Sequence, residues 1–249
     1  MVNQLLIKHL KIGVLVISLI LTPNAGWTQT RLEAETSYPH HAEVNPSRVA
    51  TRPRPRPITG TPDGSRTGGG TRPGESASQC RQTTHPPTAL VPEDGKGATA
   101  MESPVVWFYM PYTNQDVTTV EFSVHDRNET TTLYRSSVQV AEVPGVMGIT
   151  IPIALEMEEA YQWKLMINCG SENYGHRDFA LDGWITRTTP DPAFEWNGVW
   201  YDALTELATR YRSNPEDTAV RTAWINLLEQ VGLADLALDT VVDAQLLSN

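Results

Sequence analysis

Signatures of well-known catalytic chemistry are absent from this sequence. It contains no Gly-x-Ser-x-Gly elbow, no His-Glu-x-x-His helix, no phosphate-binding loop and no dinucleotide fingerprint. Hydrolysis by an activated serine, zinc proteolysis and nucleotide chemistry therefore lack local support. His40-His41 could suggest a metal site, but no carboxylate or cysteine framework surrounds the pair. We expect no catalytic residues, no metal and no cofactor.

Cysteine is scarce, because only Cys80 and Cys169 occur. In an oxidising compartment a lone pair most simply forms one disulfide. The chain-entropy model gives about 4–5 kcal/mol for closing a loop of this length, as an upper estimate. Two free thiols, or half of a metal site, are the alternatives.

Basic residues are few in the second part of the chain. Residues 80–249 contain ten Lys or Arg against 24 Asp or Glu, a net charge of −14 with His neutral. An acidic surface repels phosphate backbones. Nucleic acid is therefore not an expected partner.

Long hydrophobic runs are also lacking. The longest candidate, Ile12–Leu21, has ten residues, well short of the roughly 20 that a membrane helix needs. Two lysines precede it, and Pro23 and small residues follow, which predicts an export signal over residues 1–28 with cleavage between Ala25 and Gln29. We expect an exported protein, periplasmic or extracellular, that meets the membrane only through this transient segment. An uncleaved anchor is the alternative.

Residues 29–79 are expected to form a disordered tail. Arg and Pro alternate over residues 52–57, three glycines stand at 68–70, and aliphatic residues are rare. Such a segment cannot bury enough apolar surface to offset its ordering entropy, and the Arg-Pro run favours an extended polyproline conformation. The tail could contact an anionic wall polymer or an acidic partner, or act only as a solvated tether.

Residues 80–190 carry the alternation of β-strands. From Tyr161 to Cys169, apolar and mainly polar residues alternate, which is the period of a strand with one buried face. Further strands are predicted at residues 88–92, 105–110, 117–125, 133–140, 149–153 and 179–185. Six or seven short strands at this spacing favour an antiparallel, immunoglobulin-like β-sandwich. A parallel sheet would need crossover helices for which the gaps are too short.

After residue 190 the period changes to that of helices, so the fold class is mainly β with C-terminal α. Apolar residues recur at three and four positions over residues 200–211 and 220–231. Asn214-Pro215 is expected to start the second helix and Gly232 to end it. A third short helix is expected over residues 233–243.

The two helices form a hairpin that resembles one tetratricopeptide-type unit. One such unit cannot bury its own apolar face. We therefore expect residues 191–249 to dock on the sandwich.

Several blocks of sequence occur in a characteristic order. They are Ala89-Leu90-Val91-Pro92, residues 107–111, Pro144-Gly145-Val146, Tyr161-Gln162-Trp163, Cys169, Trp184-Ile185, residues 200–204 and residues 224–233. This series resembles the cyanobacterial family called domain of unknown function 928, over residues 78–240. The resemblance implies an exported cyanobacterial protein and carries no established activity.

Aromatic residues supply the candidate binding site. Trp184, Trp196, Trp200 and Tyr201 lie near the predicted junction of sandwich and helices. An exposed aromatic ring can stack on a sugar or on an apolar side chain of a partner. The alternative is that these rings are buried in the seam between the two parts.

Two polar groups could support chemistry. Glu172, His176, Asp178 and Asp182 crowd one loop and its exit, and carboxylates with a histidine can perform acid–base catalysis. The same residues can also form a solvated acidic rim. The range His125–Glu129 could hold a cation, but a hairpin tip requires the same polar residues for its turn.

Three functions follow from these patterns. The favoured one is a non-catalytic extracytoplasmic binding module whose partner is an envelope or membrane protein. The alternatives are a cell-wall or carbohydrate-binding domain and a hydrolase of unfamiliar type. The sequence does not indicate an oligomeric state.

Overall fold

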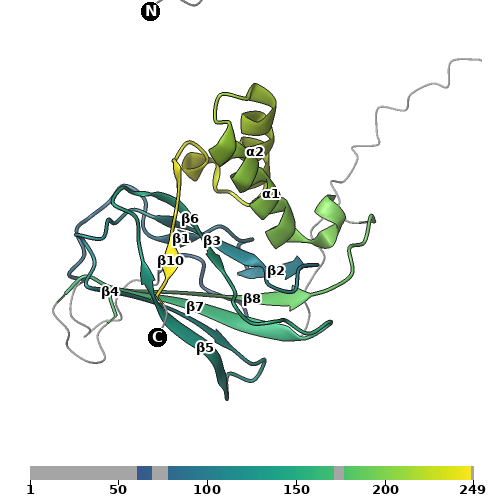
Figure 1. Ribbon diagram of the computed structural model, residues 1–249, viewed down its shortest axis with the longest axis horizontal. Coiled ribbons are helices and arrows are strands. Elements are labelled where there is room, and N and C mark those ends of the chain that lie inside the picture. Colours follow the sequence, from purple (N-terminus) through teal and green to yellow (C-terminus); the bar gives the residue numbers. More distant parts are fainter. Residues whose placement is uncertain (1–60, 69–77, 171–176, 194, 248–249) are drawn as a thin grey trace, which may run out of the picture. The chain divides into compact units, whose positions relative to one another are not determined.

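The computed structural model describes residues 61–68, 78–170, 177–193 and 195–247 (Figure 1). All of them belong to one compact unit of the chain, residues 50–249. The predicted export signal and the Arg-Pro run lie outside the described residues.

Ten strands form two sheets. The four-stranded sheet has the order β1 (Thr88–Ala89), β3 (Val105–Met110), β6 (Gly145–Thr150) and β9 (Val241–Val242). The six-stranded sheet has the order β10 (Gln245–Leu246), β5 (Thr132–Gln139), β4 (Thr119–His125), β7 (Ala160–Asn168), β8 (Phe179–Arg187) and β2 (Lys96–Thr99). The described chain is therefore mainly β, as predicted.

Both sheets are mixed, which corrects the prediction of an antiparallel sandwich. β2 runs parallel to β8, with Lys96 opposite Trp184, and β9 runs parallel to β6. The argument from short gaps failed because each parallel pair joins strands far apart in the sequence. No short connection has to cross the sheet between them.

The core lies between the two sheets. Trp163 and Phe122 of the six-stranded sheet are fully buried and meet Phe108 of the four-stranded sheet edge-on, at 5.4 and 6.4 Å between ring centroids. Gly183 lets β8 approach Trp163, because a Cβ there would lie 2.3 Å from the indole Cζ2. Burying each such aromatic ring stabilises the fold by about 1.5–3 kcal/mol.

Three strands that the sequence pattern does not predict, β2, β9 and β10 (Gln245–Leu246), are all short. No strand is predicted between residues 92 and 105, yet β2 begins at Lys96. Residues 233–243 were expected to be a helix, but contain the 3₁₀ turn η2 (Ala234–Leu236) and then β9. Strands of two to four residues are too short to display a period.

Two helices follow the strands. The 3₁₀ turn η1 (Glu195–Gly198) leads to α1 (Trp200–Ser213) and then α2 (Thr218–Gln230). The predicted capping of α2 by Asn214 is wrong, because the N–H of Asn214 donates to the carbonyl of Arg210 and ends α1. Asp217 is the N-cap instead, and its carboxylate accepts hydrogen bonds from two N–H groups of the first turn.

Gly232 ends α2, as predicted. Its φ is 73°, a left-handed conformation that glycine adopts without strain. The N–H of Leu233 then donates to the carbonyl of Leu228 at 2.9 Å, which closes the last turn.

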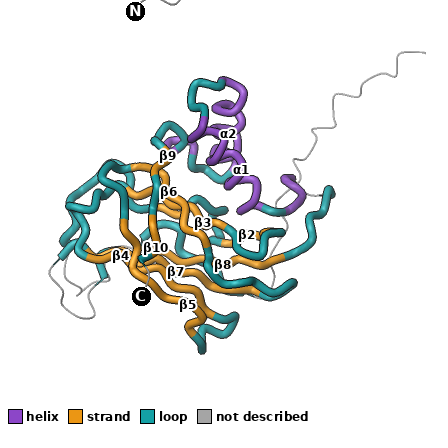
Figure 2. The backbone as a smooth tube through the Cα atoms, in the orientation of Figure 1, coloured by secondary structure: helices purple, strands orange, loops and turns teal. Residues whose placement is uncertain are grey.

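The helices lie over the four-stranded sheet (Figures 1 and 2), and the first turn of α1 also contacts the end of β2, at the edge of the six-stranded sheet. The indole Nε1 of Trp107 in β3 donates to Thr205 Oγ1 in α1 at 3.0 Å. Trp224 of α2 stacks on Tyr211 of α1 with 6.0 Å between ring centroids, and its indole N–H donates to the carbonyl of Ala237. None of the described helices is long and apolar enough to cross a membrane.

Residues 61–68 join both sheets, and we call them the N-terminal segment. The N–H of Ala89 donates to the carbonyl of Arg66 at 2.7 Å, and the N–H of Asp182 donates to the carbonyl of Ser65 at 3.0 Å. The Arg66 guanidinium also donates to the carbonyl of Val231, at the end of α2, at 2.6 Å. The folded body therefore begins upstream of the predicted boundary at residue 80.

Candidate functional site

Trp200 and Tyr201 are buried in the seam between helices and sandwich. Trp200 Nε1 donates to the carbonyl of Leu90 at 2.9 Å. Trp163 Nε1 donates to the Tyr201 hydroxyl at 2.8 Å, and that hydroxyl donates to the carbonyl of Trp184 at 3.2 Å. Complete burial raises the pKa of Tyr201 well above its usual value. These two rings hold the seam together.

Asp202 connects α1 to the end of β2. Its carboxylate accepts hydrogen bonds from the Ala100 N–H, at 2.8 Å, and from the Thr99 hydroxyl. The first turn of a helix also favours a negative charge. Asp202 therefore fixes the entry of α1 against the six-stranded sheet.

The other two candidate aromatics occupy different surroundings. Trp184 is 1 % exposed, and its indole Nε1 has no hydrogen-bond partner in the described part of the chain. Trp196 is partly buried and packs edge-on against Trp200, with 5.2 Å between ring centroids. Three of the four predicted binding residues are thus buried. This agrees with the alternative that the aromatic rings are buried in the seam between the sandwich and the helices. A ligand contact by any of them stays a prediction.

The acidic residues of the second candidate group make separate contacts. Asp178 accepts hydrogen bonds from the N–H groups of Gln79, at 2.6 Å, and Cys169, at 2.8 Å. Asp182 accepts from Gln162 Nε2 at 3.3 Å, and burial raises the pKa of its carboxyl. Glu172 and His176 lie outside the described residues.

A serine–histidine pair lies on β4, which the sequence reading missed. Ser123 Oγ is 3.0 Å from His125 Nε2, and both side chains are buried. The other ring nitrogen is 3.3 Å from the Thr132 hydroxyl rather than from a carboxylate. Burial, followed by the nearby charges of Lys164 and Arg135, lowers the pKa of His125. Without a carboxylate to orient the ring, this pair falls short of a hydrolytic triad.

At the hairpin tip between β4 and β5, the contacts agree with the interpretation that the polar residues form the turn. The Asp126 carboxylate accepts hydrogen bonds from the Thr131 N–H and the Thr130 hydroxyl, each at 2.8 Å. These bonds lower the pKa of Asp126, with the backbone bond from Thr131 as the largest cause. Asp126 therefore shapes the turn.

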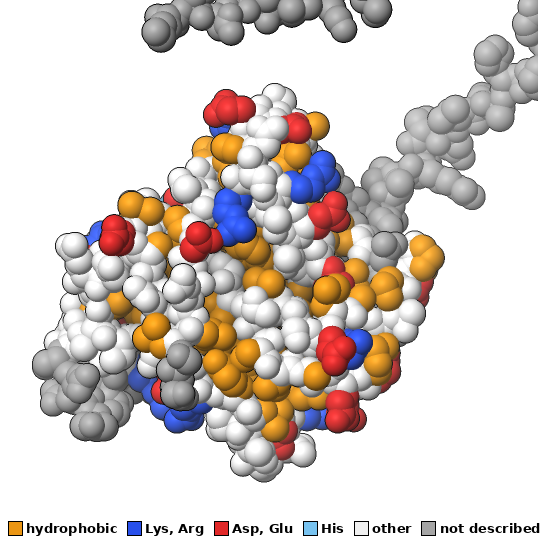
Figure 3. Space-filling model, in the orientation of Figure 1, with side chains coloured by type: hydrophobic (Ala, Val, Ile, Leu, Met, Phe, Trp, Pro, Cys, Tyr) orange, Lys and Arg blue, Asp and Glu red, His pale blue; other side chains and the backbone are white. Residues whose placement is uncertain are grey.

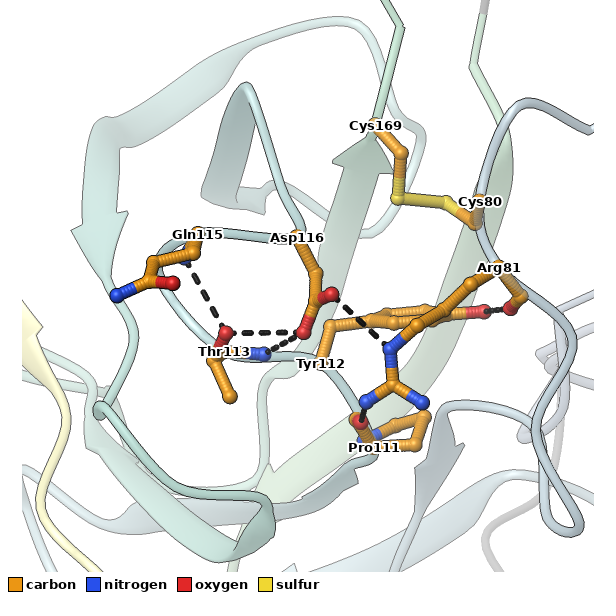
Figure 4. Close-up of polar contacts among 8 residues, drawn as sticks. All are labelled: Cys80, Arg81, Pro111, Tyr112, Thr113, Gln115, Asp116 and Cys169. Atoms are coloured by element: carbon orange, nitrogen blue, oxygen red, sulfur yellow. Dashed lines mark hydrogen bonds and ion pairs between the residues drawn. A yellow bond between two sulfur atoms is a disulfide. The ribbon is translucent and has the colours of Figure 1, made fainter.

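The predicted disulfide is present between Cys80 and Cys169 (Figure 4). A carboxylate oxygen of Asp178 lies within 4.8 Å of both sulfurs. Because the sulfurs are bonded to each other, they offer no thiolates to a metal. The group is therefore a structural anchor.

Arg81 extends this anchor to the loop after β3 (Figure 4). Its guanidinium pairs with Asp116 at 3.0 Å and donates to the carbonyl of Pro111 at 2.7 Å. It also lies 5.7 Å from the ring centroid of Tyr112. Hydrogen bonds from the Thr113 N–H and from Arg81 lower the pKa of Asp116.

A groove of about 230 Å³ opens between α1 and the four-stranded sheet, and we call it the helix–sheet groove. Its lining comes from β3, β6, α1, β9 and the two residues after β9: Val105, Trp107, Gly148, Thr150, Thr205, Thr209, Arg212, Val242, Asp243 and Ala244. The sequence reading missed it, because no local pattern indicates that these four segments meet.

An ion pair spans the rim of this groove. Arg212 Nη1 lies 2.5 Å from Asp243 Oδ1, which links α1 to the chain after β9. Figure 3 shows basic and acidic side chains next to each other where the helical pair meets the sheets. Inside the groove, Thr205 accepts from Trp107 and donates to the carbonyl of Tyr201 at 2.7 Å. The groove thus combines an indole, hydroxyls and a neutralised pair of charges.

A second recess, of about 280 Å³, lies beside β4 and β5. Its lining includes no charged side chain and consists of Asn114, residues 117–120, residues 137–140 and Leu247. It therefore offers a ligand hydrogen bonds but no charged group, unlike the helix–sheet groove.

Comparison with known proteins gives a family but no precedent for this site. The family model described as Domain of Unknown Function (DUF928) matches residues 67–241. No curated protein and no solved structure matches the chain significantly. The matched range begins inside the N-terminal segment and ends in β9, so it includes β1 to β8 and both helices. The chain belongs to the DUF928 family.

Proposed function

We propose that the protein is a non-catalytic binding module and that the helix–sheet groove is its contact site. The groove itself is the observation that carries this proposal. It places the Arg212–Asp243 pair, the Trp107 indole and several threonine hydroxyls around one recess. Binding sites typically combine an apolar wall with a few convergent polar groups.

The proposal includes export to the periplasm or beyond, with an envelope or membrane protein as partner. A disulfide persists in oxidising compartments, and residues 1–28 have the pattern of an export signal. A cyanobacterial origin belongs to the same proposal and rests on the family resemblance. We also retain, as proposals, the likeness of the sheets to an immunoglobulin sandwich and of α1–α2 to a tetratricopeptide unit.

Binding is favoured over an unfamiliar hydrolase by the contacts of the candidate residues. Asp178 is committed to backbone N–H groups beside the disulfide, and Asp182 to Gln162. Catalysis would need a nucleophile or base together with groups that stabilise the transition state at one place.

Blocking the groove tests the proposal. Thr209 is exposed and lines the groove, whereas Thr222 is exposed on α2 outside its lining. We expect Thr209→Trp to reduce saturable binding to envelope material from the producing organism at least about tenfold, the equivalent of 1.4 kcal/mol. Thr222→Trp should bind like the unmodified protein.

Equal binding by both variants would contradict the groove as the contact site. Equal thermal unfolding midpoints for the two variants would exclude misfolding as the reason for any loss.

A further inference from the structure

We infer that the N-terminal segment fills a peptide-acceptor site of the folded body, and that an extended segment of a partner protein binds there when it displaces this segment. The site lies where the edges of β1 and β8 meet the end of α2. It shares no residue with the lining of the helix–sheet groove. The inference therefore goes beyond the proposed function and does not depend on it.

The segment meets the edges of both sheets through its backbone. The N–H of Asp182 in β8 donates to the carbonyl of Ser65 at 3.0 Å, and the N–H of Ala89 in β1 donates to the carbonyl of Arg66 at 2.7 Å. Without the segment, both edges would present unpaired main-chain groups at these residues. Extended peptides bind such edges by adding a strand.

Two positions of the segment give the site its selectivity. A Cβ at Gly64 would lie 2.6 Å from the carbonyl oxygen of Asp182, so the backbone of β8 leaves room there only for glycine. Two residues later, the Arg66 guanidinium donates to the carbonyls of Val231 and Val91, at 2.6 and 3.3 Å. The site therefore recognises a glycine that is followed two residues later by an arginine.

Little apolar surface fixes the segment in place. Its one hydrophobic residue, Pro62, is exposed, and so is Asp63, which pairs with Lys96 at 2.9 Å. An exposed ion pair contributes little to stability. The family match begins at Thr67, so residues 61–66 lie outside the matched range. The acceptor edges thus belong to the matched body, whereas most of the segment that fills them does not.

A partner protein is a better occupant than a second copy of this chain. In each copy the segment is tethered to its own body, and a tethered ligand competes at an effective concentration in the millimolar range. Exchange between two copies would replace every contact by an identical one and lose this advantage. A partner segment instead gains contacts that it does not otherwise make. The protein's own segment therefore acts as an autoinhibitory contact that keeps the site closed to weaker ligands.

Fluorescence anisotropy with a labelled peptide of residues 61–68 tests the inference on the full chain. Gly64→Val expels the protein's own segment and changes no residue of the acceptor site. We expect this variant to bind the peptide saturably. The unmodified protein should bind it at least about tenfold more weakly, because its own segment leaves the site open for less than about a tenth of the time.

Variant peptides test the selectivity of the site. Peptides with Gly64→Val or Arg66→Ala should bind the Gly64→Val protein at least about tenfold more weakly than the natural peptide, because each loses one of the two selective contacts. The matched control is the peptide with Thr67→Ala, since the Thr67 side chain is exposed. It should bind like the natural peptide.

Hydrogen exchange locates the bound peptide. The amides of Asp182 and Ala89 should exchange faster in Gly64→Val than in the unmodified protein, and adding the peptide should protect them again. The Arg66→Ala protein, which weakens the same segment at another contact, provides a second titration in case Gly64→Val does not fold.

Four results would overturn the inference. They are no saturable binding to either variant protein, equal affinity of the variant and unmodified proteins, equal binding of the natural and Gly64→Val peptides, and protection away from Asp182 and Ala89. Size-exclusion chromatography tests the choice of occupant. An unmodified protein that is dimeric, with a monomeric Gly64→Val variant, would identify a second copy as the occupant and contradict the partner protein.

Discussion

The indole of Trp163, in the core of the sandwich, donates a hydrogen bond to the hydroxyl of Tyr201, on the first turn of α1, at 2.8 Å. Both side chains are completely buried. The bond joins the core of the sheets to the helical pair that forms one wall of the groove. The position of the groove therefore depends on this seam.

Tyr201→Phe should destabilise the protein by about 1–3 kcal/mol, because it leaves the buried N–H of Trp163 without its acceptor. Denaturant unfolding of the single and double variants with Trp163→Phe measures the coupling between the two residues. If the loss in unfolding free energy of the double variant equals the sum of the two single losses, the bond does not hold the seam together.

Replacing both cysteines, Cys80→Ala with Cys169→Ala, should cost about 2–5 kcal/mol, because the unfolded chain gains freedom when the bridge is lost. Thermal unfolding with and without reductant measures the loss. Reductant should lower the unfolding midpoint of the unmodified protein and leave that of the double variant unchanged. A midpoint that does not respond to reductant in either protein would contradict the role of the disulfide.

Arg66→Ala should cost about 1.5–3 kcal/mol, because the charged guanidinium donates to the carbonyl of Val231 at the end of α2. Chemical unfolding of this variant is best compared with that of Arg221→Ala, exposed on α2, as a surface control. A loss no larger than that of the control would mean that the N-terminal segment does not stabilise the helices.

His125 should make stability depend on pH. Its folded pKa lies below the unfolded value of 6.5, chiefly because burial disfavours the charged form. The neutral side chain therefore contributes stability above pH 6.5, and this contribution is lost as the pH falls through the folded pKa.

Denaturant unfolding from neutral to mildly acidic pH gives the free energy of unfolding of the unmodified protein and of His125→Gln. The difference between the two free energies isolates the contribution of His125. We expect the unmodified protein to lose more stability on acidification than the variant. Parallel curves would show that His125 does not titrate differently in the folded protein.

The sequence predicted those parts of the fold that repeat a local pattern. The alternation from Tyr161 to Cys169 identified β7, and the spacing of apolar residues identified both helices. The left-handed Gly232 was also predictable, since glycine readily adopts the conformation that ends a helix. The disulfide followed from there being only two cysteines.

The rest depends on contacts between distant segments. Parallel pairing of β2 with β8 leaves no trace in the local sequence, and Asn214 and Asp217 are both plausible helix caps. The groove brings together Trp107, Thr150, Thr209 and Asp243, whose separation in the chain conceals their proximity. The candidate aromatics were identified, but whether Trp184 and Trp200 were exposed or buried required the tertiary structure.

Site-specific photocrosslinking tests most directly whether the groove is the contact site. A photoreactive residue replaces Ser213, which is exposed next to Arg212 and one helical turn from Thr209, or Thr222 on α2 as the control. After illumination on envelope material, we predict a covalent adduct from position 213 and none from position 222. Adducts from position 222 alone, or from both positions equally, would contradict binding through the helix–sheet groove.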